Sequence, residues 1–261
     1  MAIPRLIRAP FRRQPPDTGA AFAAWLKTPA GEQLLAEERR VLAEALPRLP
    51  GLRALQCCAG TPESLLESSV MPLKWTLGTQ PGVDIIARPS QLPLPRQCLD
   101  LVLLHHSLDF EDDPHLVLGQ LARALQPGGA LVVVGFQPLG LWGLWRLFRL
   151  HSSKVPWIGR FIRPHRVSDW LQVLACEVEG FDSGLYNLPL AGSMRRRFRW
   201  LDTLGARFWS QHGAFYVLVA RKRAAVMRPS RPRFSLPQAA PNVVPVSMAR
   251  WRQRHEPDAT E

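Results

Sequence analysis

Two adjacent histidines, His105 and His106, follow a near-continuous apolar run from Leu99 to Leu104. An imidazole titrates close to neutral pH, so a histidine here could accept a proton from a substrate. Because side chains alternate along a strand, we expect one ring to face a cleft and the other to point away. The alternative is that neither side chain does chemistry. Asp109 is either a third catalytic group or an acid that favours the start of the next helix.

Predicted strands and predicted helices alternate along the chain and would position His105, His106 and Asp109. Short apolar runs predict strands, and apolar runs with helical spacing, begun by Thr28-Pro29 or Asp113-Pro114, predict helices. The predicted strands are 52–58, 73–77, 83–87, 99–104, 130–136, 178–183 and 214–220. The predicted helices are 29–49, 62–69, 114–125, a segment within 136–150, and 164–178.

This alternation indicates an α/β fold with a doubly wound, mostly parallel sheet and right-handed crossovers. Ligands of such sheets bind beyond the carboxyl ends of the strands. The loops after Cys58, Leu77, Ala87 and Leu104 should therefore surround any ligand.

The formal net charge of +12 is concentrated at the two ends of the chain. Residues 1–13 carry +4 and residues 195–261 carry +10, so the stretch between them sums to −2. Such basic ends could bind the phosphates of nucleic acid or of an anionic membrane. They could equally serve only to keep the protein in solution.

The four cysteines form no CxxC pair, so we expect neither a metal site nor a disulfide scaffold, and a reducing cytoplasmic location. The most hydrophobic window, 131–150, contains Gln137, Pro138, Arg146 and Arg149. It is therefore a poor candidate for a transmembrane segment. The oligomeric state is not predicted.

The stretch from Gln91 to Phe136 resembles the type 11 family of class I S-adenosylmethionine-dependent methyltransferases. A Leu-Pro loop, an Asp-Leu-Val strand, a short helix and a Pro-Gly-Gly turn follow one another in that family's order. The matching residues are Leu92-Pro93-Leu94-Pro95, Asp100-Leu101-Val102, Pro114 and Gln126-Pro127-Gly128-Gly129.

A narrower resemblance, over residues 20–223, is to a little-described proteobacterial branch of that family. It is carried by Trp25-Leu26-Lys27-Thr28-Pro29, Gly135-Phe136-Gln137-Pro138, Leu141-Trp142-Gly143-Leu144, Asp169-Trp170-Leu171 and Phe215–Ala220. The resemblance implies a seven-stranded sheet with a helical N-terminal extension and lid insertions. It also implies S-adenosylmethionine as cofactor.

The family holds this cofactor with a glycine-rich loop after the first strand, an acid after the second and a polar residue after the third. Here the loop is degenerate: only Gly60 remains, beside the small Cys58 and Ala59. No acid follows Leu77, and Arg88 stands where an Asp is expected. The site must therefore be judged separately from the fold.

The resemblance nevertheless implies where each part of the cofactor would lie. We expect its methionine end against Cys58, Ala59 and Gly60, and its adenine near Arg88, Pro89 and Ser90. His105 would stand at the methyl-transfer side, which makes His105, His106 and Asp109 the candidate catalytic residues.

Two aromatic segments lie outside this motif. A helix within 136–150 would place Leu141, Trp145 and Phe148 on one face, either as a lid over the acceptor or as packing on its own domain. The Arg195–Trp209 segment interleaves arginines with aromatics, which suits RNA or anionic lipid as well as an ordinary solvated helix.

We therefore expect a basic N-terminus at 1–17, a methyltransferase-like domain at 18–223 and a basic, Pro/Arg-rich disordered tail at 224–261. The expected function is methyl transfer to an unidentified, small-molecule acceptor. Two alternatives stay open. One is a catalytically inactive binding module with this fold, and the other is binding of RNA or an anionic membrane through residues 195–261.

Overall fold

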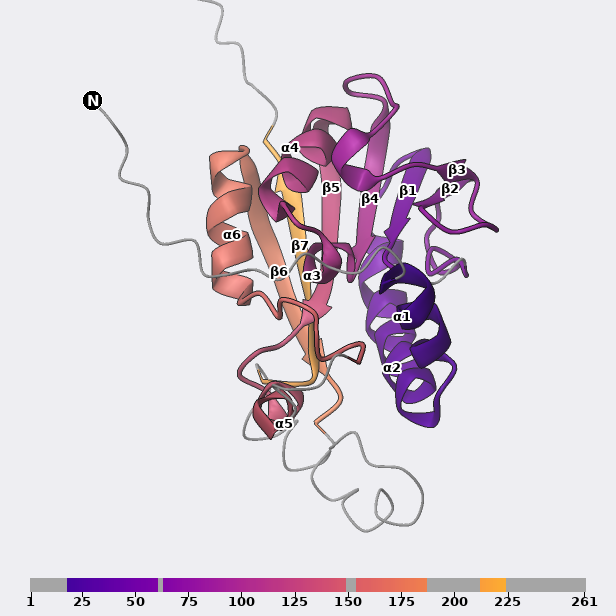
Figure 1. The fold of residues 1–261 in the computed structure, drawn as a ribbon. Coiled ribbons are helices and arrows are strands. Elements are labelled where there is room, and N and C mark those ends of the chain that lie inside the picture. The colour runs from indigo at the N-terminus through magenta and orange to yellow at the C-terminus, as the bar shows by residue number, and fades with distance from the viewer. Residues whose placement is uncertain (1–17, 61–62, 149–153, 187–211, 224–261) are drawn as a thin grey trace, which may run out of the picture. The chain divides into compact units, whose positions relative to one another are not determined.

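A seven-stranded sheet forms the centre of the computed structural model, which describes residues 18–60, 63–148, 154–186 and 212–223 (Figure 1). Its order is β3-β2-β1-β4-β5-β7-β6. The first five strands pair in parallel, whereas β7 runs antiparallel to both β5 and β6. The strands are β1 (Arg53–Cys58), β2 (Leu73–Gly78), β3 (Ile85–Ile86), β4 (Leu99–His105), β5 (Leu125–Phe136), β6 (Cys176–Gly184) and β7 (Phe215–Lys222). The prediction of a mostly parallel, seven-stranded sheet is confirmed.

Helices begin where the sequence offers a cap. The Thr28 hydroxyl accepts a hydrogen bond from the Gly31 N–H at the start of α2, and the Asp113 carboxylate accepts one from the Leu116 N–H at the start of α4. The helices are α1 (Thr18–Leu26), α2 (Pro29–Ala45), α3 (Ser107–Phe110), α4 (Pro114–Ala124), α5 (Leu141–Phe148) and α6 (Pro164–Val173), with 3-10 turns at Leu46–Arg48 and Pro89–Gln91.

Each face of the sheet is covered by its own set of helices. On one face, α1 and α2 pack against alternate residues of β1, β4, β5 and β7, and on the other, α4 and α6 pack against the residues between them. The strands in the middle of the sheet are buried on both sides, and every residue of β4 is inaccessible to solvent or nearly so. This explains why β4 is mostly apolar, with Asp100 and His105 as its polar residues.

The connections around β1, β2 and β3 contain no α-helix among the described residues. The helix predicted at 62–69 is wrong: described residues 63–72 form turns and bends, and Leu65, Leu66 and Met71 fill the space that a helix would occupy. The buried Gln56 side chain replaces helical hydrogen bonds. Its amide donates to the Glu63 carbonyl at 2.8 Å, and its oxygen accepts from the Leu65 N–H at 2.6 Å.

The aromatic segment after β5 contacts its own domain through Trp142. Trp142 of α5 is buried, and its ring lies 5.9 Å from that of Trp25 and 6.4 Å from that of Phe136. Leu141 and Trp145 of the same helix are half-buried, so the choice between a lid and packing on the domain stays a prediction. The side chain of Phe148, the Arg195–Trp209 segment and the two basic ends lie outside the described residues.

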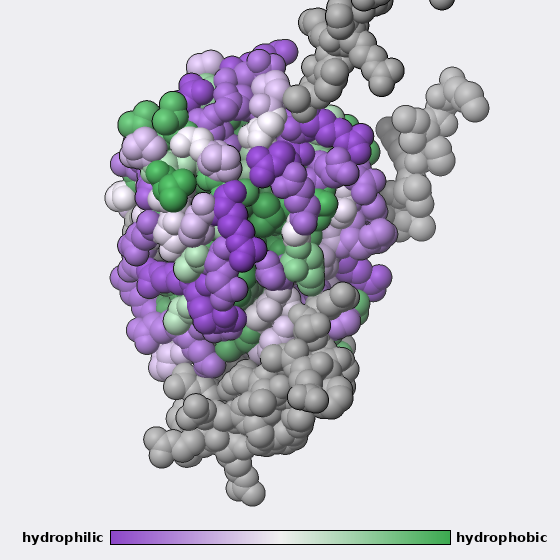
Figure 2. Space-filling model, turned by 180° about the vertical axis from the view of Figure 1, so that it is seen from behind, coloured by the Kyte–Doolittle hydropathy of each residue, from purple (hydrophilic) through white to green (hydrophobic). Residues whose placement is uncertain are grey.

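The helices of the described residues can be compared with the length and hydrophobicity that a bilayer requires. No helix in the part of the chain that the structure describes has the length and apolar character needed to cross a bilayer. Seen from behind, the surface of the described residues is mostly hydrophilic, with hydrophobic residues exposed between the hydrophilic ones (Figure 2).

Gln56 provides a test of how the helix-free connection is held. Replacing Gln56 with Leu should lower the free energy of unfolding by about 1–3 kcal/mol, because it removes the side-chain acceptor of the buried Leu65 N–H. Urea unfolding followed by circular dichroism measures this. Gln172→Leu, at an exposed position of α6, is the matched control and should change little. Equal effects of the two substitutions would contradict the role given to Gln56.

Candidate functional site

Four buried polar side chains meet at the carboxyl end of β4. The two carboxylate oxygens of Glu38, from the middle of α2, lie 2.9 Å from His105 Nε2 and 2.8 Å from His106 Nε2. The other ring nitrogen of His106, Nδ1, lies 2.9 Å from Asp109 Oδ2. All four side chains are at most 1% exposed. The structure thus brings His105, His106 and Asp109 together, and adds a carboxylate from a distant helix.

Both imidazoles reach the same carboxylate because the strand ends between them. His105 is the last residue of β4, whereas His106 has a φ of 51° and a ψ of 12°, which is the left-handed region. This turn redirects the second side chain. The expectation that strand alternation would send the rings to opposite sides is therefore wrong, because alternation holds only while the backbone stays extended.

The charges within this cluster follow from burial and from the short contacts. Burial alone raises the pKa of Glu38, but the two imidazoles outweigh it and lower that pKa to about 2. Burial lowers the pKa of His105, and Glu38 offsets this only in part. Burial acts in the same direction on His106, yet Glu38 and Asp109 together raise its pKa to about 9. At neutral pH, His106 is an imidazolium between two carboxylates and His105 is neutral.

The backbone around the cluster is fixed by further hydrogen bonds. Asp109 Oδ2 accepts the N–H of Phe136 at 3.1 Å, and the Ser107 hydroxyl donates to the Cys57 carbonyl at 2.8 Å. The ring of His106 stacks on Phe136, with centroids 4.0 Å apart. Asp109 therefore holds a neighbouring imidazole and strand β5 in place, deep inside the domain.

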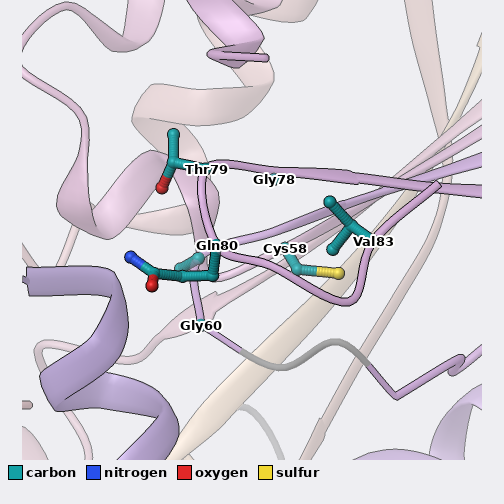
Figure 3. A pocket seen from close by; sticks show the side chains of 7 residues that line it. Cys58, Gly60, Gly78, Thr79, Gln80 and Val83 are labelled. Atoms are coloured by element: carbon teal, nitrogen blue, oxygen red, sulfur yellow. The ribbon is translucent and has the colours of Figure 1, made fainter. Parts of the chain in front are cut away.

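A separate, open pocket of about 10 Å³, which is room for about one water molecule, lies at the carboxyl ends of β1 and β2. Its walls are small or polar residues, and Figure 3 shows the side chains of Thr79 and Gln80 on one side with Cys58 and Val83 on the other. The lining residues are Cys58, Ala59, Gly60, Gly78, Thr79, Gln80 and Val83.

Helix α1 closes the pocket on the side towards β4. A Cβ placed on Gly60 would lie 2.6 Å from the Gly19 carbonyl oxygen and 2.8 Å from the Ala23 nitrogen, so the helix backbone rests directly on this glycine. Further along the same helix, the buried ring of Phe22 lies 5.4 Å from that of His106 and 6.4 Å from that of His105. The helix thus separates the open pocket from the histidine cluster.

The residues expected to bind a cofactor fall into two groups. Cys58, Ala59 and Gly60 line the pocket. Arg88 is exposed, and neither it nor Pro89 and Ser90 belong to the pocket wall. His105 lies on the strand next to Cys58, where its carbonyl accepts the N–H of Ala59, but its buried ring points into the cluster with Glu38.

Sequence reasoning missed two residues of this region, Glu38 and Phe22. A signal for Glu38 exists, because it follows Leu34 and precedes Leu42 by four residues each and so lies on the apolar stripe of α2. An acid on such a stripe needs a buried partner. Phe22 belongs to α1, which the sequence analysis did not predict.

Comparison with known proteins gives a consistent assignment. Residues 69–133 match the family described as a methyltransferase domain. The protein YafS of Escherichia coli is 31% identical over 145 residues, which is 54% of this chain and 55% of that protein. The demethylmenaquinone methyltransferase of Renibacterium salmoninarum is 31% identical over 111 residues, 38% of this chain and 47% of that enzyme. The matches thus span about half the length of these curated relatives.

Solved structures extend the likeness over most of the domain. A Haloferax volcanii methyltransferase, solved in complex with a methyltransferase activator, superposes with a TM-score of 0.58 at 14% identity and covers 79% of this chain and 98% of its own. An S-adenosylmethionine-dependent methyltransferase of Thermotoga maritima gives 0.53 at 18% identity, covering 78% and 99%. The chain therefore has the class I methyltransferase fold, and its residues 69–133 match a methyltransferase domain.

Proposed function

We propose that the protein transfers a methyl group from S-adenosylmethionine to a small-molecule acceptor in the cytoplasm, with the cofactor at the carboxyl ends of β1 and β2. The observation that carries this proposal is the pocket there, because ligands of doubly wound sheets bind at that edge, near the strand where the order reverses. The cofactor supplies an activated methyl group, and the protein's task is to position the acceptor in line with it.

The residues of the pocket fit the chemical groups of the cofactor. Gly60 and Gly78 lack side chains, so a ligand can approach their backbone closely. No acid lines this pocket, but the Thr79 hydroxyl and the Gln80 amide oxygen can accept hydrogen bonds from a ribose diol. These two residues would take over the role of the missing carboxylate.

The volume of the pocket sets a condition on binding. Ligand sites typically have volumes of about 300–1,000 Å³, whereas this pocket of about 10 Å³ has room only for a water-sized group and must widen before a nucleoside-sized ligand can enter. The wall that limits it is α1, which rests on Gly60 and approaches Gln80. Full binding therefore requires α1 to move away from Gly60, and this movement would join the pocket to the space beside β4.

The catalytic roles of His105, His106 and Asp109 stay a prediction. Their side chains are buried under α1 and bonded to one another or to Glu38, so they face an acceptor only after the same movement. A proton acceptor is needed only when the attacking atom carries a proton. Positioning at the β1–β2 edge is therefore the minimal mechanism.

Ligand titration with matched variants tests the placement of the site. Folded wild-type protein should bind S-adenosylhomocysteine in a calorimetric titration. Val83→Trp should abolish binding by filling the pocket, and Gln80→Ala should weaken it by about 1 kcal/mol, or roughly fivefold, through the loss of one hydrogen bond. Gln172→Ala, on the distant α6, should bind like wild type.

Two results of this titration would decide against the proposal. Wild-type affinity in Val83→Trp would place the cofactor elsewhere. Absence of binding by folded wild-type protein would favour the alternative of a catalytically inactive binding module, which the altered cofactor loops also suggest.

Hydrogen exchange tests the movement of α1. Binding of S-adenosylhomocysteine should speed amide exchange in α1, because the helix must leave its seat on Gly60, while exchange in α4 on the opposite face stays the same. Mass spectrometry of the free and saturated protein gives both rates. Unchanged exchange in α1 of the saturated protein would mean that the pocket holds the ligand without any movement.

The charge of the C-terminal region favours a second candidate function, which is binding of nucleic acid or an anionic membrane through residues 195–261. This region carries +10. If it binds RNA through Lys and Arg, the affinity of the full chain should fall steeply with salt, and a chain ending at Arg223 should bind more weakly at low salt. Fluorescence anisotropy with labelled RNA, and flotation with anionic vesicles, separate the two partners. Equal binding by both chains would show that residues 224–261 contribute nothing.

A further inference from the structure

The cluster around Glu38 has the donor set of a metal site. One carboxylate oxygen of Glu38 and the Nε2 atoms of His105 and His106 lie within 4.8 Å of one another, and all three residues are buried. Two imidazoles and a carboxylate are the ligands that zinc and ferrous ions take most readily. The ligands come from α2 and from the end of β4, so an ion between them would connect two distant parts of the chain.

A second carboxylate holds one of the candidate ligands in the orientation that metal sites use. Asp109 Oδ2 accepts a hydrogen bond from His106 Nδ1 at 2.9 Å and is itself held by the N–H of Phe136. With Nδ1–H bonded to a carboxylate, the lone pair of Nε2 is the one available to an ion. Histidines that bind metal ions in proteins usually donate their other ring N–H to a carboxylate or carbonyl in this way.

The charge of the cluster also fits a divalent cation. Glu38 and Asp109 are both carboxylates in a space walled by Phe22, Phe110 and Phe136. A divalent cation bound between the imidazoles would therefore be attracted by both carboxylates.

The hydrogen-bonded geometry is close to that of a coordinated ion. Metal-to-ligand distances of about 2.0–2.2 Å place neighbouring ligand atoms roughly 3–3.5 Å apart. The present nitrogen-to-oxygen distances of 2.9 Å and 2.8 Å would have to widen only slightly as the ion replaces the shared protons. The three ligand atoms lie within 4.8 Å of one another, so a pair near that limit would have to approach by rotation of its side chains.

We propose that Glu38, His105 and His106 bind a divalent transition metal ion of the zinc class, with Asp109 orienting His106. The site is closed to solvent, so the ion would have a structural role, and the two oxygens of Glu38 with the two Nε2 atoms would supply four ligand atoms. The ion fastens α2 to the end of β4 and enters as the chain folds. This inference is independent of methyl transfer and does not rest on the proposed function.

Reconstitution of the full chain tests the site directly. The protein, carrying no polyhistidine tag, is unfolded with chelator and refolded with Zn²⁺ or with Co²⁺. We expect one tightly held equivalent by elemental analysis after gel filtration, and cobalt absorption bands of a low-coordinate nitrogen and oxygen environment. A chelator added during refolding should lower the midpoint of thermal unfolding.

Matched variants assign the ion to these residues. Glu38→Gln keeps the shape of the side chain and removes its charge, so it should lose the bound metal. His165→Gln removes an exposed histidine that lies 3.8 Å from Asp169 on α6, and it should bind metal as wild type does. If Glu38→Gln does not fold, X-ray absorption of the zinc-loaded wild type decides, because it must report two imidazole ligands.

Several outcomes would overturn the inference. Folded wild-type protein that retains no metal after refolding with zinc or cobalt would mean that the cluster is held by protons alone. Equal metal content in Glu38→Gln and wild type, or a zinc spectrum without two imidazoles, would place the ion elsewhere. Titration of the same samples with S-adenosylhomocysteine reports separately on the proposed cofactor site.

Discussion

The arrangement of the whole carboxyl edge depends on one buried carboxylate, that of Glu38, which accepts hydrogen bonds from two imidazoles at once. A charge without such partners would not be tolerated at this depth. The pair of bonds therefore fixes both the rotation of α2 about its axis and its position along the sheet. Helix α1 follows from this, because the N–H and the hydroxyl of Thr28 both donate to the Trp25 carbonyl and close the turn between the two helices.

The second constraint is the absence of helices from the connections on one side of β1. In most doubly wound sheets each crossover carries a helix that buries one face. Among the described residues, the segment 63–72 contributes Leu65, Leu66 and Met71 to the core on that side, and α1 lies on Gly60. The pocket and the contact between α1 and Gly60 therefore lie at the same edge of the sheet. The position of α1 determines whether a ligand can enter the pocket.

The sequence was informative where a pattern has a single physical meaning. Apolar runs such as Leu99–Leu104 can be buried only between two layers, and Thr28-Pro29 can only begin a helix, so the sheet and α2 were predicted well. Helix α1 was missed because its residues, TGAAFAAWL, are small or apolar on every side and show no polar face. The helix predicted at 62–69 failed because the partner of that backbone is Gln56, which a local pattern does not reveal.

The candidate site was harder to predict than the fold, for a similar reason. His105, His106 and Asp109 were found from their place after a buried strand, but their partner Glu38 lies far away in the chain. Its neighbour Glu37 is also an acid, and only the periodicity of α2 separates the buried one from the one nearer solvent. The left-handed turn at His106 has no sequence signal, since its residue type does not require it.

The shortness of β3 has a consequence for how stability is distributed. Only two residues of β3 pair with β2, and the side chain of Ile86 is exposed, so separating this edge exposes little further apolar surface. The centre of the sheet, β4 and β5, separates only when both cores are lost. The walls of the pocket at Gly78–Val83 thus belong to a part of the molecule that opens at a lower free-energy cost than β4 and β5. A ligand bound there would stabilise this region against local opening. Slower amide hydrogen exchange at Gly78–Val83 would therefore reveal the ligand at lower concentrations than a rise in the midpoint of thermal unfolding.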